Sequence, residues 1–233
     1  MRDSTPKKAP AADPQVRRSR RKEARPGELL AAALDLFVEK GFAATRVEEV
    51  AQRAGVSKGT LFLYFPSKEE LFKAVVRENI SGRFAEWSDE IDRFDGSAHE
   101  MLRHCLFNWW ERIGSTQASG IPKLIMSEAQ NFPELASFYQ QEVMQPGNAL
   151  IERMLKRGVE RGEFRPMDLT YGAYLVQAPM LFLALWKHSM GPSCGDHAQL
   201  DPHKYLAAQL DLLTHGFSQP KIHPHPTLEH PLS

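Results

Sequence analysis

Apolar side chains recur at every third or fourth position along most of residues 26–216, which is the spacing of helices with one buried face. In the first such segment, residues 26–40, these positions are Leu30, Ala33, Leu34 and Phe37. Capping residues, glycines and prolines divide the remainder into further predicted helices, at residues 67–87, 97–113, 121–130, 131–162 with a kink at Pro146-Gly147, 168–190 and 201–216. Residues 114–120 read as a flexible polar loop. No segment alternates as a strand would, so we predict an all-α fold.

Two short helices joined by a tight turn are predicted within residues 45–68. Thr45 and Glu48 have the spacing of a capping box that starts the first helix, and Gly55 suits the left-handed position that ends it. Ser57 is placed to cap the second helix, whose buried stripe contains Leu61 and Phe65. This helix-turn-helix arrangement allows the second helix to lie in the major groove of DNA.

The exposed face of that second helix combines a cation, hydroxyl groups, an aromatic ring and a glycine: Lys58, Gly59, Thr60, Phe62 and Tyr64. A glycine near a helix N-terminus permits close approach to a phosphate or a base edge. We therefore predict that this face reads DNA.

At these positions the chain resembles the TetR family of bacterial transcriptional regulators. The resemblance rests on Gly41-Phe42, Thr45, Val50-Ala51, Ala54-Gly55-Val56-Ser57, Gly59-Thr60-Leu61, Tyr64-Phe65 and Ser67-Lys68. It implies an N-terminal three-helix helix-turn-helix unit, a helical half that binds a small molecule and dimerises, and a two-fold dimer on a palindromic operator. Residues 123–164 are similar to the C-terminal domain of AefR-like members.

The resemblance also implies roles for single residues. Thr45 and Arg46 would contact phosphate, Tyr64 and Lys68 would clamp the DNA backbone, and Lys58, Gly59, Thr60 and Phe62 would face bases. Phe62 and Leu63 stand where this family often has tyrosines, so Phe62 would press on a thymine methyl group instead of bonding a phosphate. Other roles remain open, since Thr45 also serves as a cap, Lys68 would be solvated if it bound no phosphate, and Tyr64 would suit a half-buried core position.

Charge is distributed unevenly although the formal net charge is +0. Residues 1–77 carry 16 Lys and Arg against 10 Asp and Glu, whereas the rest of the chain carries 13 against 19. The basic half contains the helix-turn-helix, as a phosphate-binding surface requires.

Four regions follow from these patterns. We expect a disordered basic arm at residues 1–25, a DNA-binding domain at 26–72, a helical regulatory and dimerisation domain at 73–216, and a tail rich in proline and histidine at 217–233. The arm either enters the minor groove beside the recognition helix or is a solvated tail.

Bulky and soft side chains on the central helices of the regulatory half are candidates for the wall of a ligand cavity. They are Cys105, Trp109, Trp110, Met126, Phe138, Gln177, Met180 and Trp186. Core packing is the more frequent role for each of them. The helices that start at Asp168 and Asp201 carry more apolar surface than one chain needs, including Leu181 and Leu210, which favours a four-helix interface between two copies.

Signals of other protein classes are missing from the sequence. It has no glycine-rich phosphate loop and no HExxH, GxSxG or CxxC motif, so we predict no catalytic residue, cofactor or metal site. The longest apolar run, residues 175–186, is shorter than the roughly 18 residues that span a bilayer, and the N-terminus lacks the apolar run of a secretory signal. We expect a cytoplasmic protein without membrane contact.

Together these patterns predict a homodimeric transcriptional repressor that binds a palindromic DNA operator. A small apolar or amphipathic effector would release it from the operator. The alternative is an activator, or a constitutive regulator without a small-molecule ligand.

Overall fold

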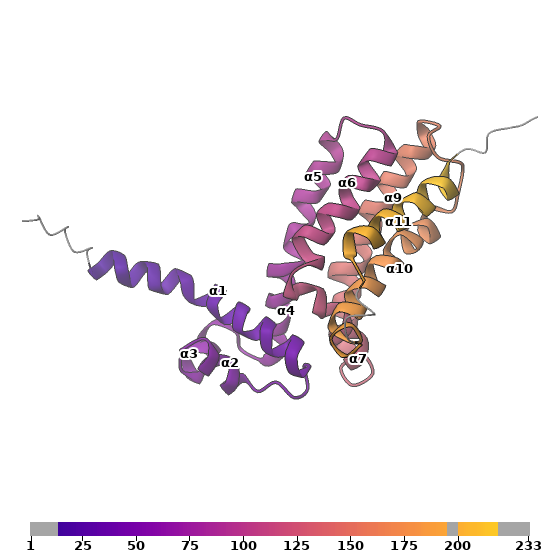
Figure 1. Cartoon of the computed structure of the whole chain (residues 1–233). Coiled ribbons are helices and arrows are strands. Elements are labelled where there is room, and N and C mark those ends of the chain that lie inside the picture. The colour runs from indigo at the N-terminus through magenta and orange to yellow at the C-terminus, as the bar shows by residue number, and fades with distance from the viewer. Residues whose placement is uncertain (1–13, 195–199, 219–233) are drawn as a thin grey trace, which may run out of the picture. The chain divides into compact units, whose positions relative to one another are not determined.

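The computed structural model describes residues 14–194 and 200–218, with side chains from Pro26 onward. These residues form helices joined by short turns, with one isolated bridge between Phe164 and Ser218 and no strand within the described ranges. The α-helices are α1 (Pro14–Lys40), α2 (Val47–Arg53), α3 (Lys58–Tyr64), α4 (Lys68–Asn79), α5 (Phe84–Arg93), α6 (Ala98–Trp109), α7 (Ile121–Glu128), α8 (Pro133–Tyr139), α9 (Gln145–Glu160), α10 (Leu169–His188) and α11 (Pro202–Phe217). The shorter turns are η1 (Ser81–Arg83), η2 (Trp110–Gly114), η3 (Gln117–Gly120), η4 (Gln140–Met144) and η5 (Gly191–Ser193). The predicted all-α fold is confirmed (Figure 1).

The chain divides into two compact units, residues 1–78 and residues 79–233. In the first unit α1, α2, α3 and α4 surround one small core. The rings of Phe37, Phe42 and Phe72 pack pairwise with centroids 5.4–5.6 Å apart, and Val50 and Leu61 are fully buried beside them. These contacts fix α2 and α3, which are too short to be stable helices alone.

Helix α1 is longer than predicted. It begins at Pro14, so residues 14–25 are helical and the expectation of a disordered segment there is wrong. Arg, Lys, Glu and Ala are favourable helix residues, and Pro26 inside the helix removes only one backbone donor. Residues 1–13 of the predicted basic arm and residues 219–233 of the predicted tail lie outside the described residues.

The predicted continuous helix at residues 67–87 is interrupted. Helix α4 ends at Asn79, and the turn η1 separates it from α5. Asn79, Ser81 and Gly82 are poor helix residues, and together they outweigh the apolar periodicity that runs through them.

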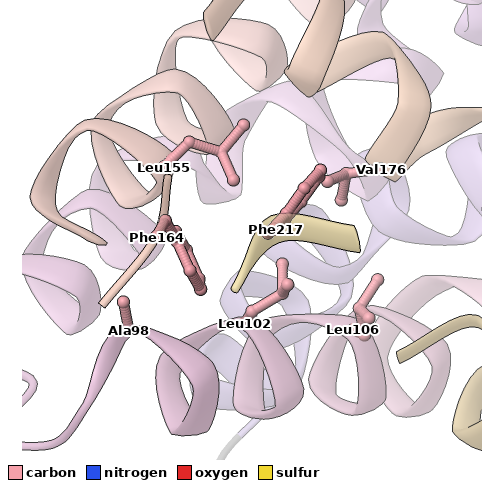
Figure 2. Packing of buried hydrophobic residues seen from close by; sticks show 7 residues of the cluster. All are labelled: Ala98, Leu102, Leu106, Leu155, Phe164, Val176 and Phe217. Atoms are coloured by element: carbon pink, nitrogen blue, oxygen red, sulfur yellow. The ribbon is translucent and has the colours of Figure 1, made fainter. Parts of the chain in front are cut away.

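The second unit is a bundle in which α9 packs against α5, α6 and α10, while α11 packs against α6 and α10 (Figure 1). Figure 2 shows its largest core cluster, in which Leu102 and Leu106 of α6 face Phe164 and Phe217. The two phenylalanine rings lie 5.7 Å apart at an angle of 62°. Gly158 of α9 leaves room for Phe164, since a Cβ there would overlap the ring.

Residues 114–120, predicted to be a flexible loop, are ordered instead. Ala118, Ser119 and Gly120 of η3 are buried. Lys187 of α10 holds this segment, because its Nζ donates to the carbonyl oxygens of Gly114, Ser115 and Thr116 at 2.7–2.9 Å.

Helix α10 is the most apolar helix of the second unit. An 18-residue window within it has a mean hydropathy of 1.3, so by length and composition it is able to cross a membrane, contrary to the prediction that no stretch is long enough. Only 28% of that window is buried. Its exposed apolar side chains are Tyr171, Tyr174, Leu175 and Phe182.

The two leucines expected at a dimer interface are partly buried within the single chain. Leu181 lies in the wall of a cavity, and Leu210 packs against the core cluster of Figure 2. The exposed leucines of these two helices are Leu175, with 61% of its surface exposed, and Leu212, with 74%.

Two helices of this unit contain a π-helical turn. The turn η2 continues α6, and η4 connects α8 to α9 directly before the predicted kink at Pro146-Gly147. The N-cap of α8 is Phe132, so the predicted cap at Asn131 is wrong. Within a longer helix such turns are uncommon and are found frequently at functional sites.

Candidate DNA-binding surface and ligand cavity

The turn between α2 and α3 forms as the sequence predicts. Gly55 has a φ of 66°, the left-handed conformation that costs little without a Cβ. The Ser57 hydroxyl accepts a hydrogen bond from the Thr60 amide at 3.1 Å and so caps α3. Leu61 of α3 is fully buried, which turns the opposite face of the helix toward solvent.

That exposed face contains Lys58, Gly59, Phe62 and Leu63. The Lys58 ammonium pairs with Glu48 of α2 and lies 5.6 Å from the centre of the Phe62 ring. Phe62 is 38% exposed and Leu63 is 84% exposed. A surface that ends in a ring and an isobutyl group is suited to apolar contact with thymine methyl groups.

Leu63 is a candidate that the motif-based analysis missed. The resemblance assigns no role to it, and its position beside the buried Leu61 gives no warning of its exposure. A leucine exposed to this extent on a seven-residue helix has no packing function in the unit.

The remaining residues assigned to base or phosphate contact have mixed positions. Arg46 is exposed at the start of α2, and its amide donates to Glu49 Oε2 at 3.4 Å. The Thr60 hydroxyl lies 2.9 Å from the Ser57 hydroxyl, and Tyr64 is half-buried.

Thr45 is placed differently from its predicted roles as cap and phosphate ligand. It is 1% exposed, and its hydroxyl lies 2.7 Å from the carbonyl oxygen of Gly41 and 3.1 Å from that of Leu36. Arg46 occupies the N-cap position of α2 instead. The Thr45 side chain therefore ties the start of α2 to the end of α1, and its hydroxyl is not available to a phosphate.

Lys68 is also committed within the unit. Its Nζ donates to the carbonyl oxygens of Phe42, Ala43 and Thr45 at 2.9, 3.3 and 3.2 Å, and lies 4.4 Å from the centre of the Phe42 ring. An ammonium has three N–H donors, so this pattern uses all of them. Lys68 therefore holds the loop between α1 and α2, and its contact with the DNA backbone stays a prediction.

Gly59 provides a test of close approach to DNA. A Cβ at this position would meet only Ser57 Oγ, at 3.8 Å, so we expect Gly59→Ala to stabilise α3 by roughly 0.5–1 kcal/mol. If Gly59 lies against a base edge or phosphate, the same methyl group should lower operator affinity by about 10-fold.

Thermal unfolding and operator titration measure the two effects separately. Gly216→Ala is the matched control, because a Cβ there also meets no atom within 4 Å and the residue lies in α11 of the other unit. Unchanged operator affinity in Gly59→Ala would remove α3 from close contact with DNA.

The second unit contains a cavity of about 500 Å³ that is partly open to solvent. Side chains from α5, α6, α7, α9 and α10 line it, together with residues of η2, η4 and Ile80. The lining is mostly apolar and includes Phe84, Trp87, Leu150 and Met154. Its volume lies within the roughly 300–1,000 Å³ typical of pockets for small molecules.

Five of the eight predicted ligand-binding residues lie in the cavity wall: Cys105, Trp109, Met126, Gln177 and Met180. The other three do not. Trp110 packs in a core cluster with Leu183 and Leu206, Phe138 is buried outside the wall, and Trp186 packs on the Phe182 ring at 6.0 Å.

Ionisable groups in the wall are few. Burial raises the pKa of the Cys105 thiol to about 12, so the thiol is protonated at neutral pH and unreactive as a nucleophile. Glu90 Oε1 accepts from Arg112 Nη1 at 2.7 Å, and Glu90 Oε2 lies 3.8 Å from His104 Nε2. Among the described residues no group of three or more His, Cys, Asp or Glu side chains is arranged to hold a metal ion.

Comparisons with known proteins agree with this arrangement. Residues 29–75 match the model of bacterial regulatory proteins of the tetR family, and residues 95–196 match the model of the tetracyclin repressor-like C-terminal domain. The first range contains the helix-turn-helix, and the second contains most of the cavity wall.

Curated relatives are transcriptional regulators. The chain is 31% identical over 151 residues to the HTH-type transcriptional repressor KstR2 of Mycobacterium tuberculosis, an alignment that covers 63% of this chain and 74% of KstR2. It is 52% identical over 62 residues to the HTH-type transcriptional regulator RutR of Escherichia coli, which covers 27% of this chain and 29% of RutR.

Solved structures share the fold. The fatty acid degradation regulator FadR of Bacillus halodurans superposes with a TM-score of 0.67 at 21% identity, over 82% of this chain and 94% of that one. FadR of Bacillus subtilis in complex with stearoyl-CoA superposes with a TM-score of 0.60 at 19% identity, over 82% and 98%. The matched domains, the repressor relative and the helix-turn-helix geometry show that the chain is a DNA-binding transcriptional regulator, not an enzyme, and that it belongs to the TetR family.

Proposed function

We propose that the chain is a cytoplasmic, homodimeric repressor that binds a palindromic operator and releases it when a small molecule occupies the cavity of the second unit. The observation that carries this proposal is the apolar cavity of about 500 Å³ in a chain that also contains a helix-turn-helix. The names of two similar proteins support it, since KstR2 is called a repressor and the Bacillus subtilis FadR was solved with stearoyl-CoA.

Dimerisation is supported by the apolar faces of α10 and α11. Tyr171, Leu175 and Phe182 of α10 and Leu212 of α11 are exposed in the single chain. Two copies of this pair of helices would cover these side chains in a four-helix interface, and a second copy is the occupant that we assign to the face. The dimer would present two α3 helices to half-sites about 34 Å apart.

The link between cavity and DNA is proposed to run through the chain that follows α4. Ile80, the residue after the last residue of α4, lies in the cavity wall. A ligand that displaces Ile80 would move the end of α4 and change the spacing between the two recognition helices. The coupling is reciprocal, so operator DNA must weaken ligand binding by the same factor.

Operator selection followed by titration tests this function. Sequences bound from random DNA should be palindromic, and a compound that binds the cavity should lower operator affinity by at least about 5-fold, a coupling of roughly 1 kcal/mol. A ligand that binds without changing operator affinity would favour the alternative of a constitutive regulator. Transcription from the selected operator distinguishes repression from activation.

Apolar reading of bases gives a second test of the same surface. Replacing thymidine by deoxyuridine in one half-site removes only the C5 methyl group of that base. Where the replaced base contacts Leu63 or Phe62, the affinity of the protein for the operator should fall by about 3- to 10-fold. In the Leu63→Ala variant, the base next to Leu63 should become insensitive to this replacement.

Arg46→Ala serves as the control for that experiment. Loss of an exposed cation should weaken all sequences alike and reduce the salt dependence, while the sensitivity to deoxyuridine remains. If no replacement of thymidine by deoxyuridine lowers the operator affinity of the unmodified protein, the proposed contact of Phe62 and Leu63 with thymine methyl groups is wrong.

A further inference from the structure

The described lining residues of the cavity include no permanently charged cation, and their one histidine, His104, lies 3.8 Å from Glu90. None of the side chains that line it is a lysine or an arginine, and its one carboxylate, that of Glu90, is neutralised by Arg112 from outside the wall. A carboxylate or phosphate inside the cavity would therefore meet no lysine or arginine, and His104 is already placed beside the carboxylate of Glu90. Burying an unpaired ion costs several kcal/mol even after the surroundings relax.

Tyr139 and Gln177 are uncharged polar side chains of the wall that form no hydrogen bond to another described residue. Tyr139 is 8% exposed and lines the cavity, yet its hydroxyl forms no hydrogen bond to another described residue. Burial raises the pKa of this phenol, which keeps it protonated as a donor. Gln177 of α10 also lines the cavity without a partner among the described residues, and a Cβ at Gly147 opposite would come within 3.5 Å of its Nε2.

The side chains of Ser119 and Asn108 in the wall are already paired. The Ser119 hydroxyl donates to the Thr116 carbonyl at 2.8 Å and lies 2.8 Å from His188 Nε2. Asn108 Nδ2 lies 2.7 Å from His104 Nε2. A polar group that is removed from water gains from a new hydrogen bond, so the buried Tyr139 and the half-buried Gln177 are positions where a ligand oxygen can bind.

We propose that the part of the effector inside this cavity is electrically neutral: an apolar body that carries an oxygen acceptor for Tyr139 or Gln177. This rests on the proposed ligand response. The same chemistry is met by a free neutral molecule, such as an alcohol or ketone, and by the acyl part of a larger molecule whose charged group stays outside the cavity.

Probes that share one chain and differ in charge test the proposal. Decanol, decanoate, decylamine and decanoyl-CoA are titrated into the full-length protein by calorimetry at pH 8. Decanol should bind at least about 10-fold more tightly than decanoate, a difference of about 1.4 kcal/mol. Tighter binding of decanoate or decylamine, or no binding by any probe, would overturn the proposal.

Tight binding of decanoyl-CoA together with weak binding of decanoate supports the proposal and identifies the effector as one with an external charged group. Tight binding of decanol and weak binding of decanoyl-CoA supports a free neutral molecule instead.

Variants of Tyr139 and Gln177 give a second readout. Tyr139→Phe and Gln177→Leu should each weaken decanol binding by about 3- to 10-fold, the loss of one hydrogen bond, without lowering thermal stability. Tyr205→Phe is the matched control, because Tyr205 is half-buried in α11 outside the cavity wall. Equal losses in Tyr205→Phe and Tyr139→Phe would contradict the assigned contact.

Operator titration separates this inference from the function on which it rests. Suppose that neutral probes bind and that the variants weaken this binding, but that the probes do not change operator affinity. That result would support the proposed ligand class and contradict the proposal that the ligand releases the protein from DNA.

Discussion

Replacing Leu175 by glutamate is expected to convert the proposed dimer into monomers and to lower operator affinity by at least about 100-fold. Leu175 is 61% exposed on α10 and lines no part of the cavity, so its side chain is not needed for the fold of the single chain. In a two-fold interface each substitution occurs twice, and both carboxylates would be buried without a partner.

Loss of the proposed dimer should lower operator affinity, because a monomer contacts only one half-site. Sedimentation measures the assembly and operator titration measures the consequence. Leu175→Met is the matched control, since it preserves volume and apolar character and should leave both quantities near their original values. A dimer that persists in both Leu175→Glu and Leu212→Glu would place the interface on another surface.

Replacing Lys68 by methionine is expected to destabilise the first unit by about 2–3 kcal/mol. The lysine donates to three carbonyl oxygens of the loop between α1 and α2, and methionine keeps the aliphatic stem but supplies no donor. These carbonyl groups would lose a charge-assisted partner, and the loop that positions α2 would open more often.

Hydrogen exchange reads this effect locally, because amides of residues 42–64 should exchange faster in Lys68→Met while those of the second unit do not change. Lys156→Ala is the control, since Lys156 forms an exposed pair with Glu160 at 3.7 Å, a kind of interaction that contributes little. Unaltered exchange combined with a shallower salt dependence of operator binding would restore the phosphate contact that the resemblance implies.

Features that depend on neighbouring residues are predictable from this sequence. Ser57, Ser97, Asp168 and Asp201 are placed at helix starts by the sequence, and each accepts a hydrogen bond from an amide two or three residues later. The bond closes within one turn, so residue type and spacing determine it.

Features that depend on partners distant in the sequence are not predictable in this way. Thr45 bonds a carbonyl nine residues earlier, and Lys68 bonds carbonyls 23–26 residues earlier, so no local pattern shows that their polar groups are used inside the unit. The cavity poses the same problem. Trp109 lines the wall and Trp110 packs in the core, although the two residues are adjacent and of one type.

The π turns η2 and η4 mark positions where the second unit can gain or lose one residue. A π turn contains one residue more than the α-helical turn that it replaces, and the insertion of one residue into an α-helix produces this arrangement. Deleting one residue within 110–114 should therefore restore the α-helical pitch and leave the helix on both sides in register. Trp109 and Ile113 line the cavity and Trp110 packs in a core cluster, so that deletion would change both the cavity wall and the packing beside it. The shape of the cavity wall is thus open to change by single-residue insertions and deletions, which in most helices would displace every side chain that follows.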